Sequence, residues 1–218
     1  MSPRLKWSRS HYRAPLRGPK APFPGYLVSV APLIREQFDS IEFDAAASGD
    51  HVAAAREMTL LARTGTGTDA MPRAEAFLRA GEQWLLADQP AEAVADLRRA
   101  IADGGPVSAD PRVPLARALF QLGRQSEAQA LIRRVKVEGR LDPRTCDLVA
   151  ELLVERSDLP AALDWATAGV ELCLAAAERG QQSDGDESEL RLLLRLRYRI
   201  RNDLGLRDDD YDAMLDEA

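Results

Sequence analysis

The sequence contains few of the side chains on which most catalytic and metal sites depend. Only two of its 218 residues are histidines and two are cysteines. Cys146 and Cys173 form no CxxC pair, so neither a zinc ribbon nor a redox motif is indicated, and both are interpreted as core residues. His11 and His51 stand at no recognised motif spacing from a nucleophile. We therefore expect a protein that is not an enzyme and binds no metal or cofactor.

Long apolar runs are also missing. No stretch approaches the ~20 consecutive apolar residues that a membrane-spanning helix needs. Prolines interrupt the basic N-terminal segment, and no small-residue cleavage site follows it, so a secretory signal is not indicated. Aromatic residues make up only 6% of the chain, and the prevalence of alanine, leucine and arginine favours helix over sheet. The expectation is a helical, cytoplasmic protein with no membrane partner.

Charge is distributed unevenly along the chain, although the formal net charge is only −6. The first 35 residues contain no acidic residue and seven basic ones, which are Arg4, Lys6, Arg9, Arg13, Arg17, Lys20 and Arg35. The rest of the chain holds 22 basic and 35 acidic residues, a net charge of −13. A basic arm is thus attached to an acidic body, and such an asymmetry is typical of an interaction segment.

The arm, residues 1–33, also holds six of the thirteen prolines, which predicts an irregular Pro-rich segment in place of a regular helix or central strand. Three interpretations of it stay open. It docks on the acidic body or on a partner, it contacts nucleic-acid phosphates, or it is a plain solubilising tail. The residues available for arm contacts are Arg4, Lys6, Trp7, Arg9, Arg13, Arg17 and Lys20.

A period of about 34 residues is the strongest pattern in the sequence. Ala93, Ala128 and Ala162 are separated by 35 and 34 residues, and each stands shortly after a turn. Each turn joins two segments of helical periodicity. Because a helix pair buries only one side, neighbouring pairs must stack to complete a core.

This pattern resembles the tetratricopeptide repeat family, whose first helix carries large and small residues and whose second carries alanine before a closing proline. In the first unit these positions hold Phe77, Ala80, Gly81, Trp84, Ala93, Leu97, Ala100 and Pro106. In the second they hold Arg112, Leu115, Ala116, Leu119, Ala128, Ile132, Val135 and Pro143. In the third they hold Cys146, Val149, Ala150, Leu153, Ala162, Ala166 and Gly169. The resemblance implies an all-α fold, a short right-handed solenoid of antiparallel helix pairs.

The chain is accordingly divided into five parts. Residues 1–33 are the arm, 34–63 a degenerate helix pair, and 74–178 three repeats. Residues 187–206 form a C-terminal capping helix, since one face is apolar and the rest is rich in arginine. Residues 207–218 are an acidic tail. Whether 34–63 is a true repeat stays open, because Glu42 stands where a small residue is expected.

Two segments look like ligand loops only superficially. The acidic run from Asp208 to Asp212 lacks the alternating ligands, central glycine and distal glutamate of a calcium loop, so a solvated tail is predicted. The segment from Thr64 to Gly67 follows a helix and precedes no lysine, so a flexible loop is predicted instead of a phosphate loop.

In the tetratricopeptide family, ligands lie along the concave face formed by the first helices. The resemblance places on this face Glu75, Leu78, Glu82, Leu85, Asp110, Arg117, Phe120, Asp147, Glu151 and Glu155. Acidic residues outnumber basic ones there, which favours a basic or mixed basic–apolar peptide. The leading hypothesis is a non-enzymatic adaptor or scaffold that binds a protein or peptide partner. The alternative is a nucleic-acid-associated regulatory protein that contacts phosphates through the arm. Homo-oligomer formation stays open.

Overall fold

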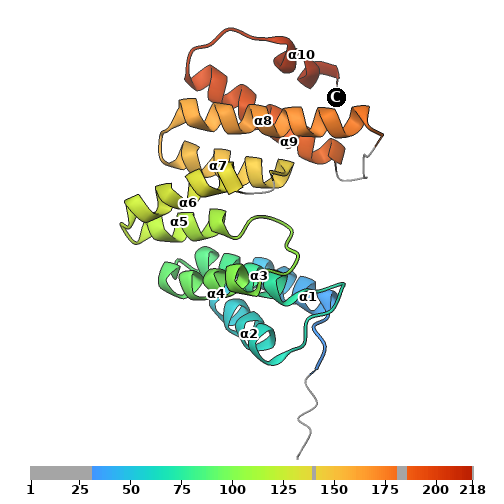
Figure 1. Ribbon diagram of the computed structural model, residues 1–218, viewed down its shortest axis with the longest axis vertical. Coiled ribbons are helices and arrows are strands. Elements are labelled where there is room, and N and C mark those ends of the chain that lie inside the picture. The colour runs from blue at the N-terminus through green and yellow to red at the C-terminus, as the bar shows by residue number, and fades with distance from the viewer. Residues whose placement is uncertain (1–30, 139–140, 181–185, 218) are drawn as a thin grey trace, which may run out of the picture.

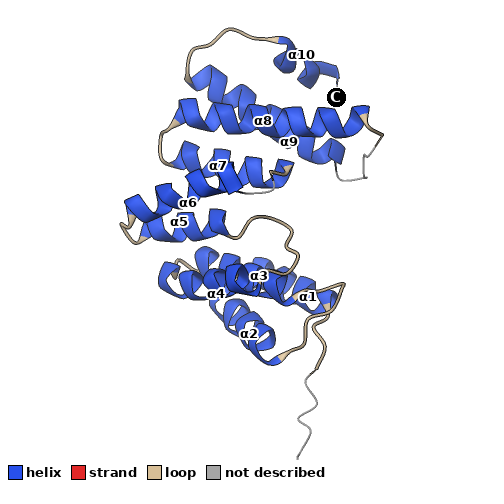
Figure 2. Cartoon of the chain, viewed as in Figure 1, coloured by secondary structure: helices blue, strands red, loops and turns tan. Residues whose placement is uncertain are grey.

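The computed structural model describes residues 31–138, 141–180 and 186–217. Within these ranges the chain forms ten α-helices and, apart from one isolated bridge, no β-structure (Figure 1; Figure 2). The predicted all-α fold class is therefore confirmed, whereas all seven predicted arm-contact residues lie outside the described residues. The helices are α1 (Arg35–Ser48), α2 (His51–Thr64), α3 (Arg73–Leu86), α4 (Pro90–Asp103), α5 (Arg112–Gln121), α6 (Gln125–Glu138), α7 (Pro143–Glu155), α8 (Leu159–Glu178), α9 (Asp186–Asp203) and α10 (Asp210–Glu217).

Helices that follow one another in the chain pack as neighbouring pairs. The pairs are α1 with α2, α3 with α4, α5 with α6, α7 with α8 and α9 with α10. In three places the second helix of one pair also packs on the first helix of the next, namely α2 on α3, α4 on α5 and α8 on α9. First helices touch one another as well, since α5 lies against both α3 and α7, and α7 lies against α9. The pairs follow one another along the long axis of the molecule (Figure 1).

Local sequence signals fix where several helices begin. Asp50, Asp142 and Asp158 are the N-caps of α2, α7 and α8, and each side chain accepts a hydrogen bond from a backbone N–H in the first turn. Such caps satisfy donors that have no partner within the helix. Proline stands in the first turn of α4, α7 and α8, where its missing N–H costs nothing.

The turns inside the three central pairs repeat the same backbone geometry. Each contains one residue in the left-handed region, and the next residue donates its backbone N–H to a carbonyl five positions earlier. The left-handed residues are Asp88, Gly123 and Ser157, with φ of 55°, 74° and 60°. The hydrogen bonds are Gln89 to Trp84 (2.9 Å), Arg124 to Leu119 (2.8 Å) and Asp158 to Leu153 (2.9 Å). The period seen in the sequence is therefore also a period of the backbone.

Small residues set the distance between the two helices of a pair. Ala93, Ala128 and Ala162 are fully buried, which agrees with their expected role. A Cβ atom placed on Gly81 would lie 2.6 Å from the side chain of Leu97, closer than carbon atoms approach one another. Helices α3 and α4 can therefore pack this closely only because position 81 has no side chain.

A buried polar cluster joins the first two pairs. The Trp84 indole N–H lies 3.1 Å from the Asp96 carboxylate and 3.2 Å from the Thr59 hydroxyl, and the hydroxyl donates to the same carboxylate at 2.5 Å. Arg99 forms an ion pair with the other oxygen of Asp96. The buried carboxylate is thus fully partnered, as burial of a charge requires. The cluster connects α2, α3 and α4.

The segment after α2 is a loop, as predicted, and hydrogen bonds hold it against the chain that enters α1. Residues 31–33 run beside it, with the Leu33 N–H donating to the Thr66 carbonyl at 2.8 Å and the Thr66 N–H donating to the Ala31 carbonyl at 2.9 Å. Leu33 is buried, and a Cβ atom on Gly65 would lie only 2.4 Å from its side chain. Gly65 therefore permits close packing of the chain that enters α1.

The acidic segment after α9 was predicted to be a solvated tail, and this prediction is wrong. Residues 210–217 form α10, which packs on α9. The buried Arg197 of α9 pairs with Asp209 and with Asp212, the latter at 3.1 Å. Arg201 pairs with the same two carboxylates at 3.0 and 2.9 Å. The arginines of α9 neutralise these acids, so the segment docks on the helix that was expected to end the array.

Helix α8 is the one helix among the described residues whose length and apolar composition would suffice to cross a membrane. Its buried face carries Trp165, Gly169 and Val170, and it packs between α7 and α9. A Cβ atom on Gly169 would lie 2.7 Å from Leu193 of α9 and 3.0 Å from the Cβ of Cys146 of α7. Core helices of folded domains have this same apolar character and close packing.

Candidate binding groove

A cavity of about 340 Å³ opens along the row of first helices, where α1, α3, α5 and α7 meet. Its lining combines aliphatic side chains with two acids and two bases. The residues are Glu42, Glu82, Gln83, Leu85, Leu86, Val113, Pro114, Arg117, Gln121, Arg144 and Leu148. We call this cavity and the exposed rim beside it the first-helix groove. Its volume falls within the range of pockets that hold small ligands or single side chains.

Three of the ten predicted face residues line the cavity, namely Glu82, Leu85 and Arg117. Arg117 already has a partner, because its guanidinium lies 3.2 Å from the Glu155 carboxylate across the α5–α7 junction. Glu155 and Glu151 are exposed on α7 beside the cavity. The groove therefore gathers predicted residues from three different units.

Two predicted face residues are buried inside the molecule, which corrects their assignment to the binding face. Leu78 has an exposed fraction of 0%, and it belongs to the apolar core. Glu75 has an exposed fraction of 5%, and its carboxylate accepts a hydrogen bond from the Ser108 backbone N–H at 2.7 Å. Glu75 thereby holds the linker between α4 and α5, and its carboxylate is engaged inside the fold.

Asp110 and Phe120 are near the surface but do not line this cavity. The Asp110 carboxylate is paired with Arg112 at 2.5 Å, and its backbone N–H donates to the Thr145 hydroxyl at 3.3 Å. Phe120 lies under the guanidinium of Arg156, which is 5.1 Å from the ring centroid. Both were predicted to face the ligand, and the structure instead gives Asp110 a role in joining α5 to α7.

Glu82 has the most unusual environment of the acidic groove residues. Burial raises the pKa of its carboxyl to about 7, with smaller upward contributions from Glu75 and Glu42 and opposing ones from Arg144 and Arg79. Among the described residues its carboxylate has no hydrogen-bonded or ion-paired side chain. A carboxyl group in this setting gains from any cation that enters the cavity.

Asp147 shows a similar but weaker effect at the side of the groove. Partial burial raises the pKa of its carboxyl to about 6, the negative charges of Glu151 and Glu189 raise it further, and Arg144 lowers it. Arg144 is exposed and lies between these acids and Glu82. The groove thus brings together two carboxyl groups, Glu82 and Asp147, whose ionised forms are disfavoured by burial. The exposed Arg144 partly stabilises both ionised forms.

Eight of the eleven lining residues are not among the ten predicted face residues, and they include Glu42, Gln83, Pro114 and Leu148. Leu148 stands 35 residues after Val113, so the repeat period could have indicated it. The prediction used a spacing of 34 residues and therefore named its neighbour Asp147. Glu42 was noted only as an obstacle to packing. Its carboxylate instead accepts hydrogen bonds from Arg79 at 2.7 and 2.5 Å, which lets α1 pack beside α3 without a small residue.

Comparisons with known proteins add no relative to this description. No family model, no curated protein and no solved structure matches the sequence. The case for a function therefore depends on the geometry of the groove.

Proposed function

We propose that this chain is a non-enzymatic binding protein whose first-helix groove holds a peptide segment of a partner protein. The expected ligand presents a lysine or arginine beside an apolar side chain. Glu82 is the observation that carries the proposal. Among the described residues its carboxyl group has no side-chain partner, and it lies in a cavity whose walls include Leu85, Val113 and Leu148. An incoming cation would supply the missing charge while its aliphatic stem lies on these walls.

The architecture gives independent support to a binding role. The repeated turn geometry and the contacts among α3, α5, α7 and α9 fit a right-handed, tetratricopeptide-like solenoid of stacked pairs. Such arrays commonly use the row of first helices as an extended binding surface. A crystal structure of the chain would test the handedness directly.

Binding should be measured with short labelled peptides by fluorescence anisotropy, comparing a lysine–leucine sequence with a glutamate–leucine sequence of equal length. The lysine–leucine peptide should bind more tightly, and Glu82→Lys should weaken it by about tenfold or more, because like charges then meet in the cavity. Glu57→Lys is the matched control, since Glu57 is exposed on α2 and does not line the groove. Equal binding by both variants would exclude the groove as the site.

A further inference from the structure

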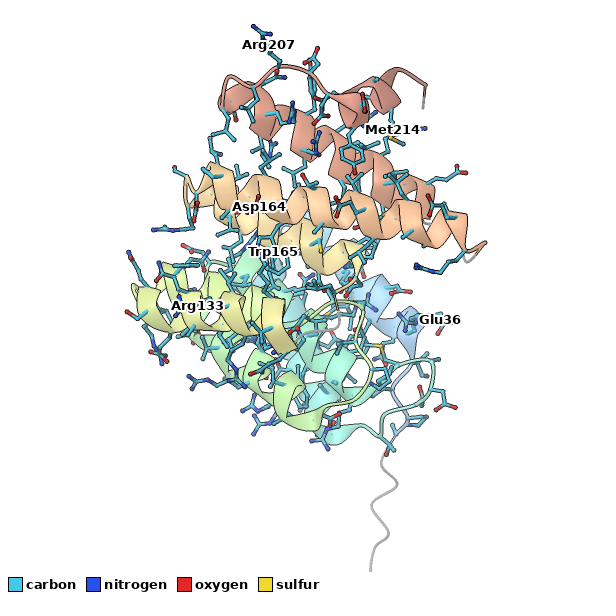
Figure 3. The ribbon with its side chains drawn as sticks, turned by 45° about the horizontal axis from the view of Figure 1, so that its top comes forward. Glu36, Arg133, Asp164, Trp165, Arg207 and Met214 are labelled. Carbon is cyan, nitrogen blue, oxygen red and sulfur yellow. The ribbon has the colours of Figure 1, made fainter. Side chains whose placement is uncertain are left out.

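A second cavity, of about 500 Å³, opens between α6 and α8, the second helices of neighbouring pairs. Its apolar floor includes Ile132, Leu153 and Trp165, and its rim carries Arg133, Lys136 and Arg156. Arg133 belongs to α6 and Trp165 to α8, the two helices on either side of the gap (Figure 3). We call this site the second-helix cleft. The first-helix groove, by contrast, is lined by α1, α3, α5 and α7.

The three cations on the rim are exposed and have no carboxylate partner among the described residues. Two of them are held over aromatic rings. The Lys136 ammonium lies 5.9 Å from the Trp165 ring centroid, and the Arg156 guanidinium lies 5.1 Å from that of Phe120. Such contacts orient a cation without neutralising it. The rim therefore presents three positive charges that are available to a ligand.

Three acids close in sequence to these cations are engaged with other arginines. Glu138 pairs with Arg134 at 3.1 Å, Glu155 pairs with Arg117 at 3.2 Å, and Glu127 pairs with Arg124 at 2.7 Å. Asp158 is the one acid that lines the cleft, and its carboxylate caps α8 through the Ala161 backbone N–H. The body from residue 36 onward has a net charge of −13, so this accumulation of positive charge runs against the rest of the molecule.

The apolar floor restricts the class of ligand. Trp165 has an exposed fraction of only 6%, so its ring cannot serve as a stacking platform for nucleic-acid bases. The floor instead offers aliphatic and ring-edge surface, which suits one aliphatic side chain. We infer that the second-helix cleft binds an acidic peptide segment of a partner protein, with carboxylates placed on Arg133, Lys136 and Arg156 and an aliphatic side chain on the floor.

This assignment goes beyond the proposed function, because the two sites prefer ligands of opposite charge. A basic segment would occupy the first-helix groove and an acidic one the second-helix cleft. The chain would then connect two partners, or two segments of one partner, on different rows of helices. Either site can fail without the other.

The test uses the full chain and a labelled peptide in which glutamates flank a leucine, followed by fluorescence anisotropy. The double variant Arg133→Glu with Lys136→Glu should weaken binding by about tenfold or more, and raising the salt concentration should weaken it as well. The milder double variant Arg133→Gln with Lys136→Gln should show a smaller loss in the same direction. Because all these side chains are exposed, circular dichroism should show an unchanged helical content.

Two control variants distinguish the second-helix cleft from the remaining surface of the chain. Arg56→Glu and Glu57→Lys change exposed residues of α2 that line neither cavity, so both should leave binding of the acidic peptide unchanged. A single-stranded oligonucleotide provides the competing ligand class. The inference is overturned if the double variants bind the acidic peptide as the parent chain does, or if the oligonucleotide binds as tightly and responds to the same substitutions.

Discussion

Replacing Glu82 with glutamine should change how the stability of this protein depends on pH. In the folded chain burial raises the pKa of Glu82 to about 7, while the unfolded chain keeps the ordinary value of 4.5. Below 4.5 the group is protonated in both states and has no differential effect. Between 4.5 and 7 the folded state binds more protons than the unfolded state, so stability falls as the pH rises. Above 7 the folded state bears the full cost of the charged carboxylate.

The size of this effect follows from the two pKa values. Each pH unit between 4.5 and about 7 corresponds to 1.36 kcal/mol, which gives a loss of about 3 kcal/mol across the window. That figure is an upper limit, because the cavity is open to water and solvent screens part of the charge. Glutamine stays neutral at every pH, so Glu82→Gln should equal the parent chain near pH 4.5 and exceed it in stability above pH 7.

Urea unfolding followed by circular dichroism at a series of pH values measures the difference. Asp147 has a pKa of about 6 in the folded state, so the stability of the Glu82→Gln variant should still fall with rising pH, but less steeply than that of the parent chain. Glu57→Gln provides the control, since that side chain is exposed on α2. If the free energies of unfolding of Glu82→Gln and the parent chain change in parallel from about pH 4.5 to pH 8, the claim that a charged Glu82 destabilises the folded state is refuted.

Three further predictions concern the interior. Gly81→Ala should destabilise the chain by about 1–3 kcal/mol, because the new methyl group meets Leu97. In urea unfolding, the destabilisation of the double variant Gly81→Ala with Leu97→Ala should differ clearly from the sum of the two single effects. Asp96→Ala should cost about 2–3 kcal/mol and change the fluorescence of Trp84, whose indole N–H loses its buried carboxylate acceptor. Burial raises the pKa of the Cys146 thiol to about 12, so mass spectrometry should find no labelling of Cys146 by a thiol reagent near pH 8 until the chain is unfolded.

The repeat could be predicted from sequence because its determinants are local. A helix pair needs a turn residue in the left-handed region and small residues where two helices cross, and both recur at fixed spacing. Asp88, Gly123 and Ser157 occupy equivalent turns although only one of them is glycine. The identities of these turn residues do not by themselves reveal the repeat. The period was recognised from the alanines that follow them, Ala93, Ala128 and Ala162.

The depth of each side chain in the groove could not be predicted in the same way. Leu78 and Val113 stand 35 residues apart at equivalent positions and both are buried, yet Val113 lines the cavity and Leu78 does not. Glu75 lost its place on the face because the linker after α4 folds over it and Ser108 donates to it. Such outcomes depend on which segment covers a position, and a helical period carries no information about that.

Near each end of the described chain a buried arginine forms ion pairs with two acids of a neighbouring helix. At one end Arg79 of α3 grips Asp39 and Glu42 of α1, and at the other Arg197 of α9 grips Asp209 and Asp212 of α10. In both cases a buried arginine on the inner helix holds two acids on the outer helix.

Small residues and apolar side chains set the spacing of the two helices within a central pair, as at Gly81 and Leu97. Charged contacts also join the central pairs, as Arg117 and Glu155 do between α5 and α7. The arginine contacts of α1 and α10 therefore add charge-assisted stabilisation to apolar packing. Composition alone predicts a solvated tail after α9, whereas Arg197 and Arg201 provide partners for its carboxylates.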